Sequence, residues 1–416
     1  MGMTIGEKIL SDAAHKDNVV SGEIITVDVD LIMSNDGTTH MTIDMFENNL
    51  KKKEIFDEKK IVFIIDHNIP AENEKTAMVH KKMRKFAKKH NIDFHQGSGV
   101  CHQIMVEDYV TSGQLILGAD SHTCTYGALG AFGTGVGCTD LLYAMVTGTT
   151  WLMVPETIRI NLNGKLPKGV YPRDLMLKII GDIGANGANY KILEFGGEGI
   201  KNFNMSDRLV LCNLAVEAGA KTGIVEPDEV TMEYLKSRGR NPKKIYHSDE
   251  DAHYEKVYEY DLNLIKPVIA RPDHIDDVVL MKNMEKVKID QAFIGSCNSG
   301  RIEDFRVAAE ILKGKKVSEK VRCIITPASN NVYLQALEEG LLSIFIESGA
   351  MIMNPNCSVC WGSCQGVIGE GEVLISTGTR NFKGRAGHRD SKVYLASVYS
   401  VAASAIAGYI TEFQAN

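Results

Sequence analysis

The sequence predicts an α/β protein in which helices cover buried, mostly parallel sheets. Short apolar runs rich in β-branched residues have the length of fully buried strands, and stretches with the 3.6-residue spacing of helices lie between them. Each apolar run also stops abruptly at a polar residue. The runs are IVFII, LILGA, AFIGS, CIITPAS, AMIMNP and VLISTGT, and the helical stretches span residues 72–90, 173–183, 302–313 and 330–339.

Polar residues follow these predicted strands directly. In sheets of this kind, ligands bind beyond the carboxyl ends of the strands. We therefore expect the residues in these positions to contribute to a common site. They are Asp66, His67, Asp120, Cys297, Cys357 and Arg380.

The length of 416 residues indicates more than one domain. Polar connectors lie at residues 164–172 and 236–255, and a new series of strands and helices starts near Lys288. We expect an N-terminal α/β lobe of two subdomains, residues 1–285, and a C-terminal α/β domain, residues 286–416.

Composition and charge argue against a nucleic-acid-binding, membrane-bound or secreted protein. The net charge of −7 provides no basic surface for nucleic acid or an anionic membrane. The apolar stretch at residues 398–410 is too short to span a bilayer and is expected to form a packed helix. No signal peptide is recognisable at the N-terminus, and the nine cysteines form no disulfide framework. We expect a cytoplasmic protein with reduced thiols and with neither a nucleic-acid nor a membrane partner.

Three cysteines indicate a metal site. Cys357 and Cys360 stand in a C-x-x-C pair, and Cys297 precedes them by sixty residues in GSCNSGR. Thiolates at this spacing suit Zn²⁺ or an iron–sulfur cluster, and spacing alone does not choose between the two metals. Buried thiols or a redox pair are the alternatives for an isolated C-x-x-C.

A set of histidines and carboxylates indicates acid–base chemistry. A single histidine is better explained as a hydrogen-bonded structural residue of the core, but the whole set is not. Loss of water from a hydroxy acid needs a proton donor for the departing hydroxyl, and carboxylate–imidazole pairs supply one near neutral pH. The set comprises Asp66, His67, His102, Asp120, His122 and Glu194.

Two arginines, Arg380 and Arg385, follow the VLIST strand. The planar fork of a guanidinium matches a carboxylate, so the pair suits a substrate with two carboxylates; a solvated surface turn is the alternative. The glycine-rich segment at 127–137 lacks the G-x-G-x-x-G spacing of a dinucleotide site and indicates close backbone packing.

Seven segments in order resemble the aconitase superfamily, and within it the large subunits of the 3-isopropylmalate, homoaconitate and 2,3-dimethylmalate hydro-lyases. The likeness runs from end to end and implies three-layer α/β/α domains around a cluster-binding cleft. The segments are DHNIP (66–70), GSGVCHQ (97–103), GADSHT (118–123), EFGGEG (194–199), EPDE (226–229), GSC (295–297) and RNFKGR (380–385).

The resemblance implies one [4Fe–4S] cluster, bound by Cys297, Cys357 and Cys360, whose fourth iron has no protein ligand and acts as a Lewis acid. It implies that His67, paired with Asp66, protonates the leaving hydroxyl. It also implies that His102, Asp120, His122 and Glu194 surround the metal-bound oxygen, and that Arg380 and Arg385 contact carboxylates and the region of the base.

The resemblance further implies a separate small swivel-domain subunit, in a heterodimer or heterotetramer, and a di- or tricarboxylic hydroxy acid as substrate. The main hypothesis is the isomerisation of 2- and 3-isopropylmalate through 2-isopropylmaleate, a step of leucine biosynthesis. Dimethylmalate or homocitrate chemistry is the alternative within the class. A cluster-free RNA-binding regulator conflicts with the charge, and a zinc-stabilised scaffold leaves the histidines and arginines unexplained.

Three departures from the usual family pattern lie beside the expected ligands. Asn298 and Ser299 replace the usual Thr-Asn pair, and Thr379 replaces an asparagine. The usual C-G-P-C-x-G is C-S-V-C-W-G here, with an additional Cys364. These changes retain the three ligands and alter their surroundings, which affects cluster stability and substrate fit.

Overall fold

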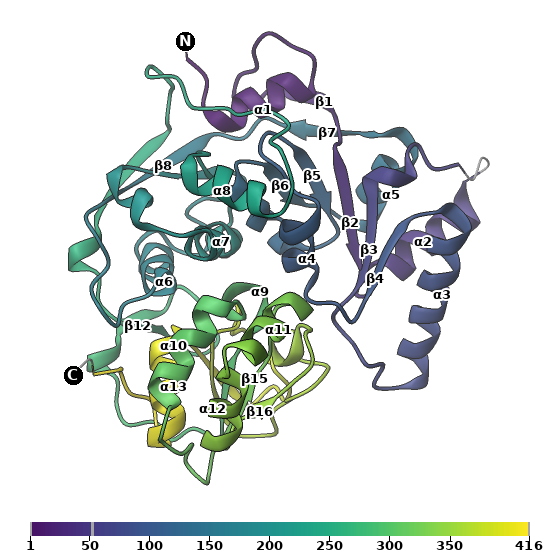
Figure 1. The fold of residues 1–416 in the computed structure, drawn as a ribbon. Coiled ribbons are helices and arrows are strands. Elements are labelled where there is room, and N and C mark those ends of the chain that lie inside the picture. Colours follow the sequence, from purple (N-terminus) through teal and green to yellow (C-terminus); the bar gives the residue numbers. More distant parts are fainter. Residues whose placement is uncertain (1, 51–53, 415–416) are drawn as a thin grey trace.

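A computed structural model describes residues 2–50 and 54–414 (Figure 1). Within these residues the strands form three sheets of four to seven strands and a two-stranded ribbon. All six apolar runs form strands, and all four helical stretches form helices, as predicted. The stretch at 398–410 contains helix α13 (Val398–Ala407).

The first sheet is parallel and has the order β4-β3-β2-β5-β6. Successive side chains of a strand point to opposite faces, and both faces are covered. Phe63 and Ile65 pack in a core with residues of the first, second, third and fifth helices, whereas Val62 and Ile64 pack in a core with α4. The strands are β2 (Leu31–Asn35), β3 (Ile61–Ile65), β4 (Asp93–Gln96), β5 (Leu115–Gly118) and β6 (Phe132–Gly135); the helices are α1 (Ile5–Ala13), α2 (Thr39–Asn49), α3 (Glu74–His90), α4 (Cys101–Asp108) and α5 (Cys138–Thr147).

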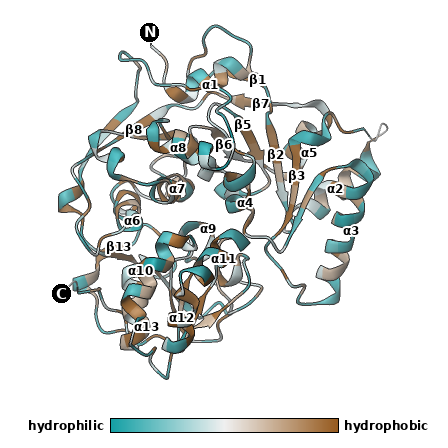
Figure 2. Ribbon diagram, viewed as in Figure 1, coloured by the Kyte–Doolittle hydropathy of each residue, from teal (hydrophilic) through white to brown (hydrophobic). Residues whose placement is uncertain are grey.

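Helix α3 shows how the sequence sets an element's ends. It begins after Asn73, whose side chain accepts a hydrogen bond from the Thr76 N–H, and ends at Asn91 in the left-handed conformation. Figure 2 shows α3 as largely hydrophilic beside the hydrophobic strands β2 and β3. The ribbon of β1 (Ile24–Asp28) and β7 (Thr149–Met153) is antiparallel.

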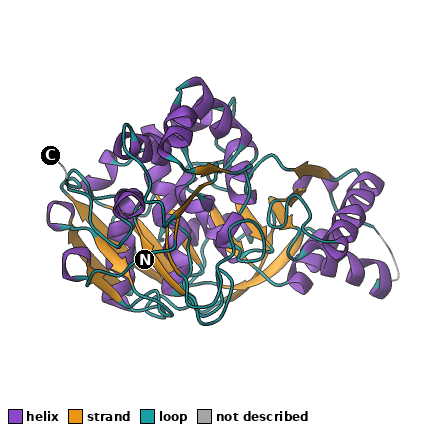
Figure 3. Cartoon of the chain, turned by 90° about the horizontal axis from the view of Figure 1, so that it is seen from below, coloured by secondary structure: helices purple, strands orange, loops and turns teal. Residues whose placement is uncertain are grey.

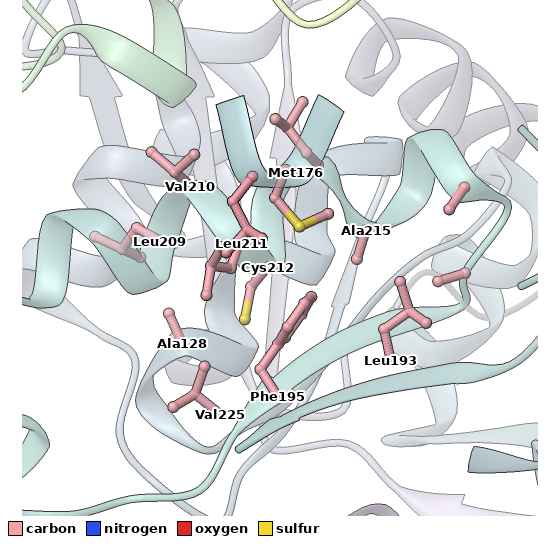
Figure 4. Packing of buried hydrophobic residues seen from close by; sticks show 14 of the residues in the cluster. Ala128, Met176, Leu193, Phe195, Leu209, Val210, Leu211, Cys212, Ala215 and Val225 are labelled. Carbon is pink, nitrogen blue, oxygen red and sulfur yellow. The ribbon is translucent and has the colours of Figure 1, made fainter. Parts of the chain in front are cut away.

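The second sheet is also parallel, in the order β10-β9-β8-β11. Figure 4 shows Leu209, Leu211 and Cys212 of α7 packed with Phe195 and Val225 of the sheet. The elements are β8 (Thr157–Asn163), β9 (Ile192–Gly196), β10 (Thr222–Val225) and β11 (Lys256–Asp261), with α6 (Pro172–Ile183), α7 (Met205–Leu214) and α8 (Glu229–Ser237).

The third sheet has the order β13-β12-β18-β17-β14-β15-β16 and is parallel from β18 onward. It includes β12 and β13, which precede residue 286, the expected start of the C-terminal domain. Its elements are β12 (Val268–Ala270), β13 (Val278–Leu280), β14 (Gln291–Ile294), β15 (Arg322–Ile325), β16 (Met351–Ile352), β17 (Val373–Ser376) and β18 (Lys392–Ala396), with α9 (Ser296–Ser299), α10 (Ile302–Leu312), α11 (Asn330–Glu338) and α12 (Leu341–Ser348).

The first and third sheets meet near the carboxyl ends of their strands. The Val100 N–H donates to the Ala328 carbonyl over 2.8 Å, and the Cys357 N–H donates to the Asp66 carbonyl over 2.9 Å. Figure 3 shows the strands enclosed between helices, an α/β architecture. No helix in the described ranges is long and apolar enough to cross a membrane.

Candidate metal-centred active site

One cavity lies where the first and third sheets meet. It brings together all three cysteines expected to bind metal and most of the expected acid–base residues. Its lining residues are His67, Val100, Cys101, His102, Asp120, His122, Ser296, Cys297, Cys357, Cys360, Trp361, Thr379 and Arg385.

The three cysteines reach the cavity from the third sheet. Cys297 lies in the short helix α9, directly after β14, and Cys357 and Cys360 border a single 3₁₀ turn (Ser358–Cys360) after β16. The Asn213 side-chain amide donates to Cys297 Sγ over 3.3 Å, and Cys360 Sγ lies 3.6 Å from Thr379 Oγ1. Each sulfur is therefore held by its own local contacts.

His67 and Asp66 form the first acid–base pair. His67 Nδ1 lies 2.7 Å from Asp66 Oδ1, and Asp66 Oδ2 accepts the Cys101 N–H over 2.6 Å. Burial opposes the charge on His67, but the Asp66 carboxylate outweighs it and raises the pKa of His67 to about 9. The imidazole is therefore protonated at neutral pH.

The loop that carries this pair is held by Asp36, a residue that no sequence motif indicated. The Asp36 carboxylate accepts the backbone N–H groups of Asp66, His67 and Asn68 over 2.9–3.0 Å. Burial raises the pKa of Asp36, but His80, His67 and these N–H donors lower it well below its usual range. Asp36 therefore remains a carboxylate beneath the loop that carries Asp66 and His67.

Asp120 joins two histidines. His102 Nε2 lies 2.8 Å from Asp120 Oδ1, and the His122 N–H donates to the same oxygen over 2.8 Å. Despite burial, these histidines lower the pKa of Asp120 well below its usual range. His67 Nε2 lies 3.8 Å from Asp120 Oδ2, so Asp120 connects the first pair to the second.

The glutamate of this hydrogen-bond network is Glu217 and not the expected Glu194. His122 Nε2 lies 3.0 Å from Glu217 Oε1, which also accepts Arg380 Nε over 2.7 Å. Glu217 lies in the 3₁₀ turn (Ala215–Ala218) that directly follows α7, and none of the seven segments quoted above contains it.

Glu194 was expected beside the metal-bound oxygen, but the structure places it away from the cavity. Glu194 lies in the middle of β9, paired with Arg159 of β8, and accepts hydrogen bonds from Ser248 and Tyr254 over 2.8 Å. Its side chain is fully buried in this ion-pair network, and it does not line the cavity. The first three residues of EFGGEG are thus part of the sheet, and the Glu194 carboxylate is held by the arginine of the neighbouring strand.

The two arginines have different surroundings. Arg380 donates hydrogen bonds from Nε to Glu217 and from a second guanidinium nitrogen to Ser121 Oγ, the latter over 2.9 Å. Arg385 lines the cavity and lies near Trp361, with 5.7 Å from its guanidinium carbon to the ring centroid. Of the two arginines, Arg385 is therefore the one that faces the cavity.

Comparison with known proteins assigns the chain to a family. A model of the aconitase family (aconitate hydratase) matches residues 7–286 and 280–408. The chain is 50% identical over 413 residues to the 3-isopropylmalate dehydratase large subunit of Hydrogenobaculum sp. (strain Y04AAS1), a match that covers 99% of this chain and 97% of that protein. The chain belongs to the aconitase family.

Other aconitase-family relatives agree in length and fold. The 3-isopropylmalate dehydratase large subunit 1 of Pyrococcus furiosus is 50% identical over 415 residues, with 98% of both chains covered. The crystal structure of aconitase X from Thermococcus kodakaraensis matches with a TM-score of 0.54 at 12% identity, covering 93% of this chain and 92% of that chain. This structural likeness shows a shared fold.

Membership of the aconitase family implies an iron–sulfur cluster, and the residues present fit one. Burial raises the pKa of Cys297 to about 12 and that of Cys357 well above its usual range. Burial also opposes ionisation of Cys360, but Arg385 and Thr379 outweigh it and lower the pKa. Three sulfurs in one cavity, two of them neutral unless a cation ionises them, are a donor set suited to bound metal.

A buried arginine is connected to Cys297, one of the three cysteines, by a chain of hydrogen bonds. Arg173, fully buried, donates to Asn298 Oδ1 and, over 2.6 Å, to the Thr377 carbonyl. Asn298 Nδ2 donates to Asn213 Oδ1 over 3.0 Å, and Asn213 in turn donates to Cys297. Arg173 and Asn213 were not predicted, because neither lies in a motif.

A fourth thiol, Cys101, also lines the cavity. It is fully buried in α4, and its sulfur lies 3.9 Å from Asn35 Nδ2. Cys364, the additional cysteine of the C-S-V-C segment, does not line the cavity.

Proposed function

We propose that this chain is the large, cluster-bearing subunit of a 3-isopropylmalate dehydratase, a hydro-lyase that interconverts 2- and 3-isopropylmalate through 2-isopropylmaleate. The observation that carries the proposal is the placement of Cys297, Cys357 and Cys360 in one cavity with the His67–Asp66 pair. Full-length similarity to curated large subunits of that name supports the choice of substrate.

Cys297, Cys357 and Cys360 would hold three irons of a [4Fe–4S] cluster. When bound, this cluster supplies an open Lewis-acid position that polarises the carbon–oxygen bond of a substrate hydroxyl. The polypeptide then has to place the substrate, protonate the leaving hydroxyl and accept a proton from carbon.

His67 is suited to protonate the leaving hydroxyl. Its Nδ1 is held by Asp66, so Nε2 is the nitrogen that faces the cavity and carries the proton to be transferred. Asp66 fixes the ring through one oxygen and is itself fixed by the Cys101 N–H through the other. The pair therefore enters the reaction already oriented, which lowers the cost of reaching the transition state.

Arg385 is suited to bind a substrate carboxylate. Its guanidinium lies beside the cysteines and makes no ion pair with any residue of the described ranges. Arg380 is held by Glu217, which also contacts His122. These contacts order the His122 side of the cavity, so the charges there are fixed before a substrate binds.

We infer that a separate small subunit completes the site. The relatives are named large subunits, which implies a smaller partner, and the base that removes the proton from carbon would come from that partner. The large subunit alone is then expected to bind the cluster and to show almost no turnover.

The test is anaerobic reconstitution with iron and sulfide, followed by mixing with the small subunit of the same organism. Formation of 2-isopropylmaleate from 3-isopropylmalate supports the proposal. A panel with 2,3-dimethylmalate and homocitrate assigns the substrate within the class. Absence of turnover on all three acids, with the cluster present, would overturn the proposal. Metal analysis separates the zinc scaffold, since about four irons per chain fit the enzyme and one zinc fits the scaffold.

A further inference from the structure

Trp361 lines the cavity, close to both His67 and Arg385. It follows Cys360 directly, and its ring meets the His67 ring edge to face, with 4.7 Å between centroids. The Arg385 guanidinium carbon also lies near this ring, 5.7 Å from its centroid. A Cβ added at Gly37 would lie 3.8 Å from the far corner of the indole. The ring therefore contacts both the proton donor and the carboxylate-binding arginine.

The backbone after Trp361 holds the indole in this position. Gly362 has a φ of +79°, and a Cβ added to it would lie 1.8 Å from the Arg385 carbonyl oxygen. Only glycine permits so close an approach. The backbone next to Trp361 is thus packed directly against the backbone of Arg385.

Two hydrogen-bond donors at this position have no acceptor among the described residues. Trp361 Nε1 and Arg385 Nε are both buried, and neither has a hydrogen-bond partner in the described part of the chain. Buried polar groups in native proteins are nearly always paired, and a buried indole N–H usually finds an acceptor. Both side chains line the cavity, so an anionic ligand in the cavity is a candidate acceptor for these donors.

We propose that Trp361 contacts the substrate and determines specificity, through an N–H that shares a substrate carboxylate with Arg385 and a ring that limits the alkyl group on the neighbouring carbon. The ligand class is a 2-hydroxy dicarboxylic acid of the malate type. This inference rests on the proposed function and deepens it. A substrate that reaches from His67 to Arg385 has to pass the indole, because the indole contacts both residues.

The two roles of the indole predict different effects of different substitutions. Trp361→Phe removes the N–H and keeps an aromatic wall. Trp361→Leu removes the N–H and most of the wall. A residue that only spaced His67 would instead change kcat by the same factor for every substrate and leave KM unchanged.

The test uses the reconstituted enzyme with both subunits and a series of malates that carry methyl, ethyl or isopropyl at the third carbon. Trp151→Phe is the matched control, because Trp151 is the other tryptophan of the chain and is 60% exposed on β7. Iron content and the visible absorption of the cluster are measured for each variant, so that loss of the cluster is not mistaken for loss of binding.

Trp361→Phe is expected to raise KM about tenfold for all three acids, with kcat changed less, as for the loss of one hydrogen bond to a charged group. Trp361→Leu is expected to shift the ratio of kcat/KM toward the larger alkyl group by about tenfold or more. The control is expected to match the wild type.

An unchanged KM in Trp361→Phe, or an equal loss for all three acids in Trp361→Leu, would overturn the inference. Either result with a wild-type enzyme that turns over isopropylmalate would leave the proposed function standing. Absence of turnover of all three acids by the wild type would instead count against the proposed function.

Discussion

Asp66 holds His67 through one carboxylate oxygen, 2.7 Å from Nδ1, and uses the other oxygen to accept the Cys101 N–H over 2.6 Å. One side chain thus orients the proposed proton donor and connects it to α4. Because Cys357 also donates its N–H to the Asp66 carbonyl, the proposed proton donor and a proposed metal ligand are both held by Asp66, across the two sheets.

Asp66→Asn should lower kcat by roughly 10²- to 10⁴-fold, because the imidazole loses the carboxylate that orients and charges it. Iron content should remain that of the wild type, since this substitution leaves the three cysteines intact. Steady-state kinetics of the two-subunit enzyme, with iron analysis of the same samples, check this. A variant with wild-type kcat would show that His67 does not act through Asp66.

Glu217 and Glu194 form a matched pair of buried glutamates with opposite expected roles. Glu217→Gln should lower kcat by roughly 10²-fold or more, because His122 and Arg380 lose their shared anion. Glu194→Gln should leave kcat within a few-fold and destabilise the fold by about 1–3 kcal/mol, since it weakens the contact with Arg159. Kinetics and thermal unfolding distinguish the two, and the reverse pattern would restore Glu194 to the site.

The failure to predict Glu217 has a physical cause. The motifs lie at strand ends, where polar residues interrupt apolar runs, and His67, Asp120 and Cys297, which follow such runs, line the cavity. Glu217 lies in the turn after α7, a helix that packs against the second sheet. Its contact with His122 therefore depends on tertiary packing. Glu194 also followed an apolar run, but it lies within β9 and points to Arg159 of the adjacent strand.

The fold itself was more accessible from the sequence. Buried parallel strands are apolar throughout, so IVFII and AFIGS were recognisable without tertiary information. The order of strands in each sheet was not, because it depends on crossovers between distant segments. Strands β12 and β13 are only three residues long, too short to produce a pattern, and they extend the third sheet past the expected boundary at residue 285.

Arg173→Met should destabilise the protein by about 3 kcal/mol, because Asn298 and the Thr377 carbonyl lose a buried donor. The chain from Arg173 through Asn298 and Asn213 to Cys297 should loosen, so iron should be lost faster in the presence of a chelator. Arg173→Lys, which keeps the charge, should lie between the wild type and Arg173→Met. Equal rates of iron loss in all three proteins would contradict this role.

Asp207, near the start of α7, makes stability depend on pH. Burial raises its pKa to about 7, although the Asn204 N–H opposes the shift. The folded state therefore holds this proton more tightly than the unfolded state, and the stability gained is present below about pH 4 and lost as pH rises through about 7. Tm should fall over this range.

Asp207→Asn keeps an oxygen acceptor for the Asn204 N–H and removes the charge. Its Tm should therefore vary less between about pH 4 and 8 and exceed that of the wild type at about pH 8. Parallel pH profiles for the two proteins would show that Asp207 does not titrate in this range.

The most direct test of the account is the metal content of cysteine variants after anaerobic reconstitution. Cys297→Ser, Cys357→Ser and Cys360→Ser should each lose most of the roughly four irons per chain expected for the wild type, together with turnover. Cys323→Ser is the matched control, since Cys323 is also a buried, reduced cysteine but lies in β15 and does not line the cavity; it should retain both. Wild-type iron content and turnover in any of the three variants would contradict the proposed site.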